Sequence, residues 1–146
     1  MQFRNPDAVE TMRADFDRQG AMAALGVTVE AVDPGRVVLE MPFDARYSQQ
    51  HGFLHAGILT TALDSACGFA AFTVMEAGAE VLTVELKTSF LRPAAGTLFR
   101  LEGRVIRAGR TLVFTEGEAV AISAEGHETP VARMSATMMA VRDLRG

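Results

Sequence analysis

The chain has 146 residues, a length typical of one domain with its own hydrophobic core. Apolar residues make up 49% and charged residues 22%, and the formal net charge of −4 gives no basic surface of the kind that binds nucleic acid. The single cysteine, Cys67, excludes an intrachain disulfide and favours a reducing, cytoplasmic location. We therefore expect one domain over residues 1–146.

The N-terminal stretch predicts a short amphipathic helix. Asn5-Pro6-Asp7 has the chemistry of a helix start, because Asn caps helices, Pro suits the first turn and an acidic side chain complements the helix dipole. Apolar residues then recur at helical spacing, at Val9, Met12 and Phe16. Gly20 is the predicted stop. The stretch is charged and has no apolar run, so we expect no signal peptide.

Two short strands are predicted next, over residues 25–32 (LGVTVEAV) and 36–43 (RVVLEMPF). Asp33-Pro34-Gly35 between them has turn chemistry. A polar loop that contains glycine follows over residues 45–54.

The most apolar segment predicts a long helix from Ala56 to near Gly78. Residues 56–75 are long enough to span a bilayer, but they contain Asp64, a serine and three threonines. Because a carboxylate in mid-membrane is costly, we expect a buried helix in a soluble domain and no membrane partner.

Four longer strands with a period of two follow, over residues 82–90, 98–107, 111–123 and 131–142. In the first, the predicted polar face is Thr83, Glu85, Lys87 and Ser89, and the predicted apolar face is Leu82, Val84, Leu86 and Phe90. In the last, one face has small and flexible apolar side chains that suit packing against a helix, namely Ala132, Met134, Ala136, Met138 and Ala140. The short connections imply an antiparallel sheet. Only one long apolar helix is available to cover this sheet, so the sheet should curve round it.

Asp64 is the only charged side chain between residues 56 and 75. Burying an unpaired carboxylate is costly, so such a residue is either hydrogen-bonded for structural reasons or has a chemical task. A carboxylate in an apolar groove can act as a nucleophile or a general base.

The tripeptide His55-Ala56-Gly57 opens the long helix. Free backbone N–H groups at a helix start can stabilise an oxyanion, although a plain junction anchored by His55 is the simpler reading. His55 and Asp64 are nine residues apart, so they face opposite sides of the helix and lie roughly 13 Å apart along it. They can serve one site only if two chains pack with the helix start of one facing Asp64 of the other, which indicates a two-fold dimer.

Other chemistries have weaker signals. Cys67 lies among small apolar residues, which is typical of a buried core cysteine. The histidines are too few and too scattered for a metal site: His51, His55 and His127. Three arginines can bind phosphates, although solvated surface arginines are the default: Arg92, Arg107 and Arg110.

The run from Gln49 through His55-Ala56-Gly57 to Asp64, followed by TVELKTSFLRPA at residues 83–94, closely resembles the hotdog-fold acyl-CoA thioesterases. The most similar branch is the phenylacetate-degradation type, related to the 4-hydroxybenzoyl-CoA thioesterases. The resemblance covers residues 25–141. It implies an α+β hotdog fold, a curved antiparallel sheet wrapped round one long central helix. It also implies homodimers, often paired into tetramers, with shared sites, and no metal or other cofactor.

The resemblance also implies roles for individual residues. Asp64 would attack the thioester or activate water, and the backbone N–H of Ala56 in the other subunit would polarise the thioester carbonyl. His55 would anchor that turn, Gln49 would position the carbonyl or the water, and Thr83 would place a hydroxyl near the carboxylate.

The predicted substrate contacts are Gly57, Phe53, Leu54 and Phe69 around the thioester and acyl group, and Arg92 and Arg110 at the CoA phosphates. Two residues depart from the family pattern. Ala56 replaces the middle glycine of a His-Gly-Gly motif, and Gln49 stands where several phenylacetate-type members have Asn. The resemblance therefore leaves the identity of the acyl group undetermined between a fatty-acyl, a phenylacetyl and a hydroxybenzoyl group. A hotdog hydratase or dehydratase and a non-catalytic acyl-CoA-binding module are the alternative functions.

Overall fold

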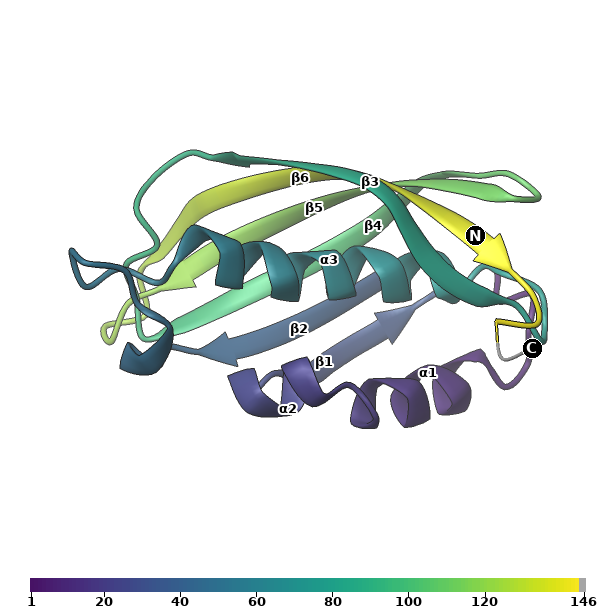
Figure 1. Ribbon diagram of the computed structural model, residues 1–146, viewed down its shortest axis with the longest axis horizontal. Helices are drawn as coiled ribbons and strands as arrows, with labels where there is room; N and C mark the ends of the chain where they lie inside the picture. The colour runs from purple at the N-terminus through teal and green to yellow at the C-terminus, as the bar shows by residue number, and fades with distance from the viewer. Residues whose placement is uncertain (145–146) are drawn as a thin grey trace.

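In the computed structural model, which describes residues 1–144, one antiparallel sheet curves round a central helix (Figure 1). The helices are α1 (Ala8–Asp17), α2 (Gly20–Leu25) and α3 (Ala56–Phe72), with a short 3-10 turn, η1 (Ala45–Tyr47). The strands are β1 (Thr28–Asp33), β2 (Arg36–Pro42), β3 (Glu80–Phe90), β4 (Leu98–Ala108), β5 (Leu112–Ile122) and β6 (Glu128–Val141). The order in the sheet is β1-β2-β4-β5-β6-β3, so β3 is an edge strand. The predicted α+β architecture is confirmed.

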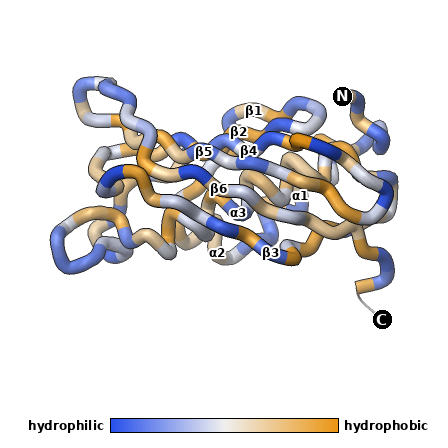
Figure 2. The backbone as a smooth tube through the Cα atoms, turned by 90° about the horizontal axis from the view of Figure 1, so that it is seen from above, coloured by the Kyte–Doolittle hydropathy of each residue, from blue (hydrophilic) through white to orange (hydrophobic). Residues whose placement is uncertain are grey.

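Two glycines let α3 lie close to the sheet. Gly103 on β4 and Gly117 on β5 are paired in register directly under the middle of the helix. A Cβ on Gly103 would lie 2.3 Å from the backbone oxygen of Ala66, and one on Gly117 would lie 2.8 Å from Sγ of Cys67. The small and flexible face predicted for the last strand also packs here, since Ala132, Met134, Ala136 and Met138 are buried. In Figure 2 the strands alternate in hydropathy, whereas the loops at their ends are largely hydrophilic.

Several predicted boundaries were wrong. The N-terminal helix is interrupted after Asp17, and Gly20 begins α2 instead of ending α1. The strand predicted from residue 25 begins at Thr28, because Leu25 ends α2 and Gly26 caps it in a left-handed conformation, φ +69°.

The central helix ends at Phe72, earlier than predicted. Thr73 is its C-cap, and its buried hydroxyl donates to the carbonyl of Ala70 and accepts from the N–H of Gly35, both at 2.7 Å. The turn between β1 and β2 is thereby tied to the end of α3.

The predicted faces of β3 were wrong at its start, because the strand contains a bulge between Thr83 and Glu85. Thr83 pairs with the inward-facing Met138, whereas Glu85 pairs with Thr137 and accepts its hydroxyl at 3.0 Å. One extra residue reverses the alternation, so Thr83 faces α3 and Leu82 faces outward. After the bulge Leu86 and Phe90 pair with inward-facing residues of β6, as predicted.

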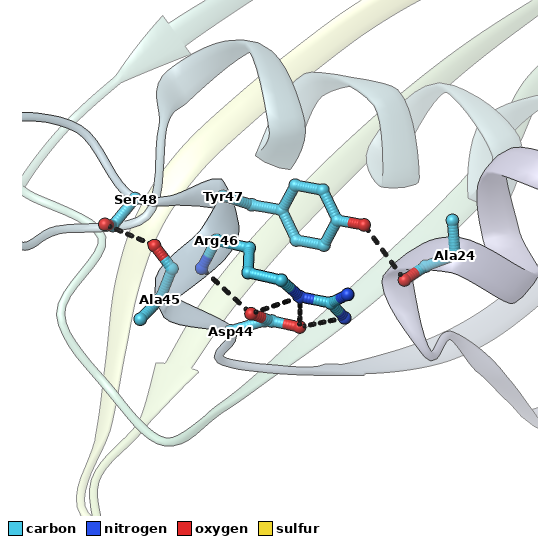
Figure 3. A network of polar contacts seen from close by, with 6 residues as sticks. All are labelled: Ala24, Asp44, Ala45, Arg46, Tyr47 and Ser48. Atoms are coloured by element: carbon cyan, nitrogen blue, oxygen red, sulfur yellow. Dashed lines mark hydrogen bonds and ion pairs between the residues drawn. The ribbon is translucent and has the colours of Figure 1, made fainter.

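The loop before α3 is anchored to α2 (Figure 3). The Tyr47 hydroxyl donates to the carbonyl oxygen of Ala24 in α2 at 3.3 Å. Asp44 caps η1 by accepting the N–H of Arg46 at 2.9 Å, and also forms an ion pair with the Arg46 guanidinium. The N–H of His55 then donates to the carbonyl of Tyr47 at 2.9 Å, so these contacts fix the point where α3 begins.

Candidate active site

The start of α3 presents a backbone N–H without a partner. His55 is the N-cap, and its Nδ1 accepts the N–H of Gly57 at 3.0 Å. Its carbonyl accepts the N–H groups of Ile58 and Leu59 at 3.0 and 3.2 Å. Within the described chain the N–H of Ala56 makes no hydrogen bond, and Ala56 is exposed. Its φ is not positive, so alanine fits this position and leaves the N–H available to a ligand.

A hollow of about 520 Å³ adjoins this N–H. It brings together five residues predicted for the site, Gln49, Phe53, Leu54, Ala56 and Arg92, and His51 also lines it. The Gln49 Oε1 accepts the N–H of His51, so its amide group is held by its own loop. The Arg92 guanidinium donates to the carbonyl of Pro130 at 2.9 Å. The hollow is mainly apolar, with an unpartnered donor on one wall and an arginine on another.

Asp64 lies in a second, smaller hollow, half-buried between α3 and β3. The Thr83 hydroxyl donates to its Oδ1 at 2.8 Å. Burial raises the pKa of the Asp64 carboxyl above its ordinary value, and the hydrogen bond from Thr83, which favours the charged form, opposes that rise. Of the other predicted contacts, Phe69 also lines this hollow of about 210 Å³.

Ala56 and Asp64 thus line different hollows of the same chain. They are eight residues apart on α3, a rise of about 12 Å. One chain therefore does not assemble both groups at a single point.

Arg110 lies apart from both hollows. It lines a third hollow of about 400 Å³ with Arg4 and Arg142, formed by the β4–β5 turn and residues beyond the end of α3. Within the chain it is not brought together with Ala56 or Asp64.

Cys67 is a core residue, as predicted. It is fully buried in α3, and burial raises the pKa of its thiol to about 12, so it stays protonated at neutral pH. Among residues 1–144, no group of three or more His, Cys, Asp or Glu side chains could hold a metal ion. In the same part of the chain, no helix is both long and apolar enough to cross a bilayer.

Five further residues of the Asp64 hollow were not assigned to the site by the sequence analysis: Gln19, Ser65, Gly68, Val81 and Leu82. Gln19 comes from the N-cap of α2, and nothing in its local pattern links it to a position 45 residues later. Gly68 could have been noticed in the sequence, because glycine inside a long helix is unfavourable and is usually kept for packing or function.

The Thioesterase superfamily model matches residues 51–125, just over half of the chain. Among solved structures, a thioesterase family protein from Silicibacter pomeroyi is 49% identical with a TM-score of 0.91, over 92% of this chain and 98% of that one. A phenylacetic acid degradation-related protein from Ralstonia eutropha JMP134 is 28% identical with a TM-score of 0.77, over 90% of this chain and 98% of that one.

Two curated relatives match over a shorter span. A protein of Saccharolobus solfataricus with a provisional esterase name is 40% identical, over 64% of this chain and 66% of that protein. Acyl-coenzyme A thioesterase 13 of Homo sapiens is 29% identical, over 61% of this chain and 64% of that protein. The chain therefore spans just under two thirds of the length of these relatives.

Proposed function

Since the chain belongs to the thioesterase superfamily, we propose that it hydrolyses an acyl-CoA thioester to a free acid and CoA. The observation that carries this proposal is the Asp64 carboxylate, half-buried in a hollow and held by the Thr83 hydroxyl at 2.8 Å. A carboxylate with one hydrogen bond and an open side can react with a bound substrate.

In the proposed reaction the N–H of Ala56 donates to the thioester carbonyl and stabilises the negative charge that develops on its oxygen. Asp64 either attacks the carbonyl carbon, giving an anhydride that water then cleaves, or takes a proton from the attacking water. The carbon–sulfur bond breaks in both routes, the CoA thiolate leaves and is protonated, and the oxygen from water stays on the acid. Gln49 positions the carbonyl or the water, and His55 fixes the turn.

Both groups can act on one thioester only if Ala56 and Asp64 come from different chains, so the proposed active form is a homodimer, alone or paired into a tetramer. The exposed edge of the sheet supports this. Leu82 and Val84 on β3 are 44% and 57% exposed, and Leu86, Phe90 and Leu91 are also exposed. Long apolar edge strands without a partner are unusual on monomers, because they invite pairing with another chain.

The CoA moiety fits the larger hollow next to Ala56. This hollow is mostly apolar and bordered by Arg92, as expected for a pantetheine arm that ends in phosphates. Arg110 would contact the phosphates only from a partner chain. The proposed location is cytoplasmic, where CoA substrates would be available and where a free cysteine such as Cys67 is usual.

Release of CoA from a panel of acyl-CoAs, acetyl to palmitoyl plus phenylacetyl and hydroxybenzoyl, tests the proposal. Asp64→Asn should lower turnover by orders of magnitude, whereas the control Asp17→Asn, on the exposed end of α1, should not. If the wild-type dimer binds acyl-CoA but releases no CoA from any member, the enzyme proposal fails and the protein is an acyl-CoA-binding module.

A further inference from the structure

The hollow around Asp64 has walls from three parts of the chain. Besides Asp64 and Thr83 it is lined by Gln19 from the start of α2, by Ser65, Gly68 and Phe69 from α3, and by Val81 and Leu82 from β3. Gln19 lies outside the residues that match the superfamily model. The N-terminal helices thus contribute directly to the hollow that contains the carboxylate.

Gly68 keeps this hollow open. It follows Asp64 by four residues and therefore lies on the same side of α3. A Cβ on Gly68 would meet no atom within 4 Å, unlike one on Gly103 or Gly117, which would collide with the backbone or side chains of α3. Glycine inside a helix is less favourable than alanine. Because no atom of the chain would contact an added Cβ, packing within the protein does not explain a glycine at this position. The open space at Gly68 points to an occupant that is not part of the chain.

Gln19 forms the wall of the hollow on the side of α2. The Ser65 hydroxyl donates to its Oε1 at 3.1 Å, which holds the side chain across the gap between α2 and α3. Gln19, Phe69 and Val81 also line a neighbouring hollow of about 270 Å³, whose other walls include Asp15, Arg18 and Glu80. Gln19 is therefore one of three residues that line both hollows, and it is the one held by a hydrogen bond to Ser65.

We propose that the hollow next to Asp64 is the acyl subsite, with Gly68 as its floor and Gln19 as its wall on the side of α2, and that these two residues limit the acyl group to a compact one. This inference rests on the proposed thioesterase function. The volume of about 210 Å³ can be compared with the cavity of about 150 Å³ that holds one benzene ring. A single ring with a short linker, or a chain of similar size, matches this volume, so we expect affinity to fall for a palmitoyl chain.

Two substitutions should move the size limit in opposite directions. Gly68→Leu fills the floor, so the affinity for octanoyl relative to acetyl analogues should fall roughly tenfold or more. Gln19→Ala removes one of the walls that the two hollows share and lengthens the subsite, so the affinity for longer chains should rise roughly fourfold for every methylene newly covered. Ser65→Ala removes only the bond that holds Gln19 and should shift the preference in the same direction by a smaller factor.

Calorimetric binding of non-hydrolysable thioether analogues of acyl-CoA, from acetyl to palmitoyl, is the readout, with CoA release measured in parallel. Gly20→Ala, an exposed helical glycine whose added Cβ also meets nothing within 4 Å, is the matched control and should leave the ranking unchanged. Gly68→Ala fills part of the floor, and its higher melting temperature would show that the helix tolerates substitution there.

The two proposals fail in different ways. An unchanged chain-length ranking in folded Gly68→Leu and Gln19→Ala overturns the acyl subsite, whatever the turnover. If Gly68→Leu and Gln19→Ala shift the chain-length preference for binding in opposite directions but neither the wild type nor any variant releases CoA, the subsite is supported and the thioesterase proposal is contradicted.

Discussion

The Thr83 hydroxyl reaches Asp64 at 2.8 Å because the strand that carries it contains a bulge immediately afterwards. If the strand alternated regularly through residue 84, Thr83 would lie on the opposite face of the strand from the helix-facing positions Leu86 and Phe90. The extra residue places all three on the side of α3. The contact between β3 and the carboxylate thus depends on one irregular position in the strand.

Ala56→Pro tests the backbone donor with little disturbance of the fold. Proline is favoured at the first position of a helix, and the preceding His55 has φ −62° and ψ 134°, which suits a residue before proline. The substitution removes only the free N–H, so kcat should fall roughly 10²–10³-fold while the melting temperature changes little. Ala56→Gly retains the N–H and serves as the control. Full activity of the proline variant would exclude Ala56 as the donor.

Mixing two inactive variants tests the shared site. Asp64→Asn and Ala56→Pro subunits, refolded together in equal amounts, should recover about one quarter of wild-type activity, because half of the dimers are mixed and each has one intact site. Steady-state turnover of the mixture is the measurement. No recovery, despite mixed dimers visible by native mass spectrometry, would place both groups in the same chain.

The pH dependence should report the contact between Thr83 and Asp64. Burial raises the pKa of the Asp64 carboxyl and the Thr83 hydroxyl holds it down, so Thr83→Val should raise it further. The acidic limb of the kcat/KM profile should then move to higher pH, since the carboxylate is the active form. Thr88→Val, at another helix-facing position of β3 that does not contact Asp64, should leave the limb in place. An unmoved limb in the Thr83 variant would mean that another group controls it.

Asp64→Asn should stabilise the folded protein at neutral pH. Because burial raises the pKa of Asp64 in the folded state, that state binds the proton more tightly than the unfolded chain. Its contribution to stability is present below the ordinary carboxyl pKa and is lost as the pH rises through the higher folded value. The gain in melting temperature over wild type should be largest near pH 7 and should disappear in acid. A gain that did not depend on pH would have another origin.

Gly103→Ala should be strongly destabilising, because the added methyl meets the backbone of Ala66 at 2.3 Å and α3 cannot move away without opening the core. Overpacking of this kind typically costs about 1–3 kcal/mol of unfolding free energy. Gly68→Ala, on the open side of the same helix, should instead gain about 0.5–1 kcal/mol. Urea unfolding of the two variants measures the difference, and equal effects would contradict this account of the packing.

Local patterns in the sequence were sufficient to predict the architecture. Alternation identified the strands, the apolar run around Asp64 identified the core helix, and short connections predicted an antiparallel sheet. The family resemblance is confirmed by the superfamily match and by the phenylacetic acid degradation-related neighbour. The catalytic roles of Gln49, His55, Ala56, Asp64 and Thr83 stay predictions.

Features that depend on distant contacts could not be predicted in the same way. A bulge adds one residue without changing hydropathy, so alternation alone turned Thr83 toward solvent, while the family resemblance correctly placed it near the carboxylate. The interruption of the N-terminal helix has no strong breaking signal at Arg18. Gln19 reaches α3 only through the tertiary packing of α2, which no local pattern describes.

The distance between Ala56 and Asp64 along α3 has a kinetic consequence under the proposed function. A chain that carries both groups but cannot use them together is inert by itself, however well it folds. At protein concentrations far below the dissociation constant of the dimer, the rate should increase with the square of the concentration, so dilution alone would switch the activity off.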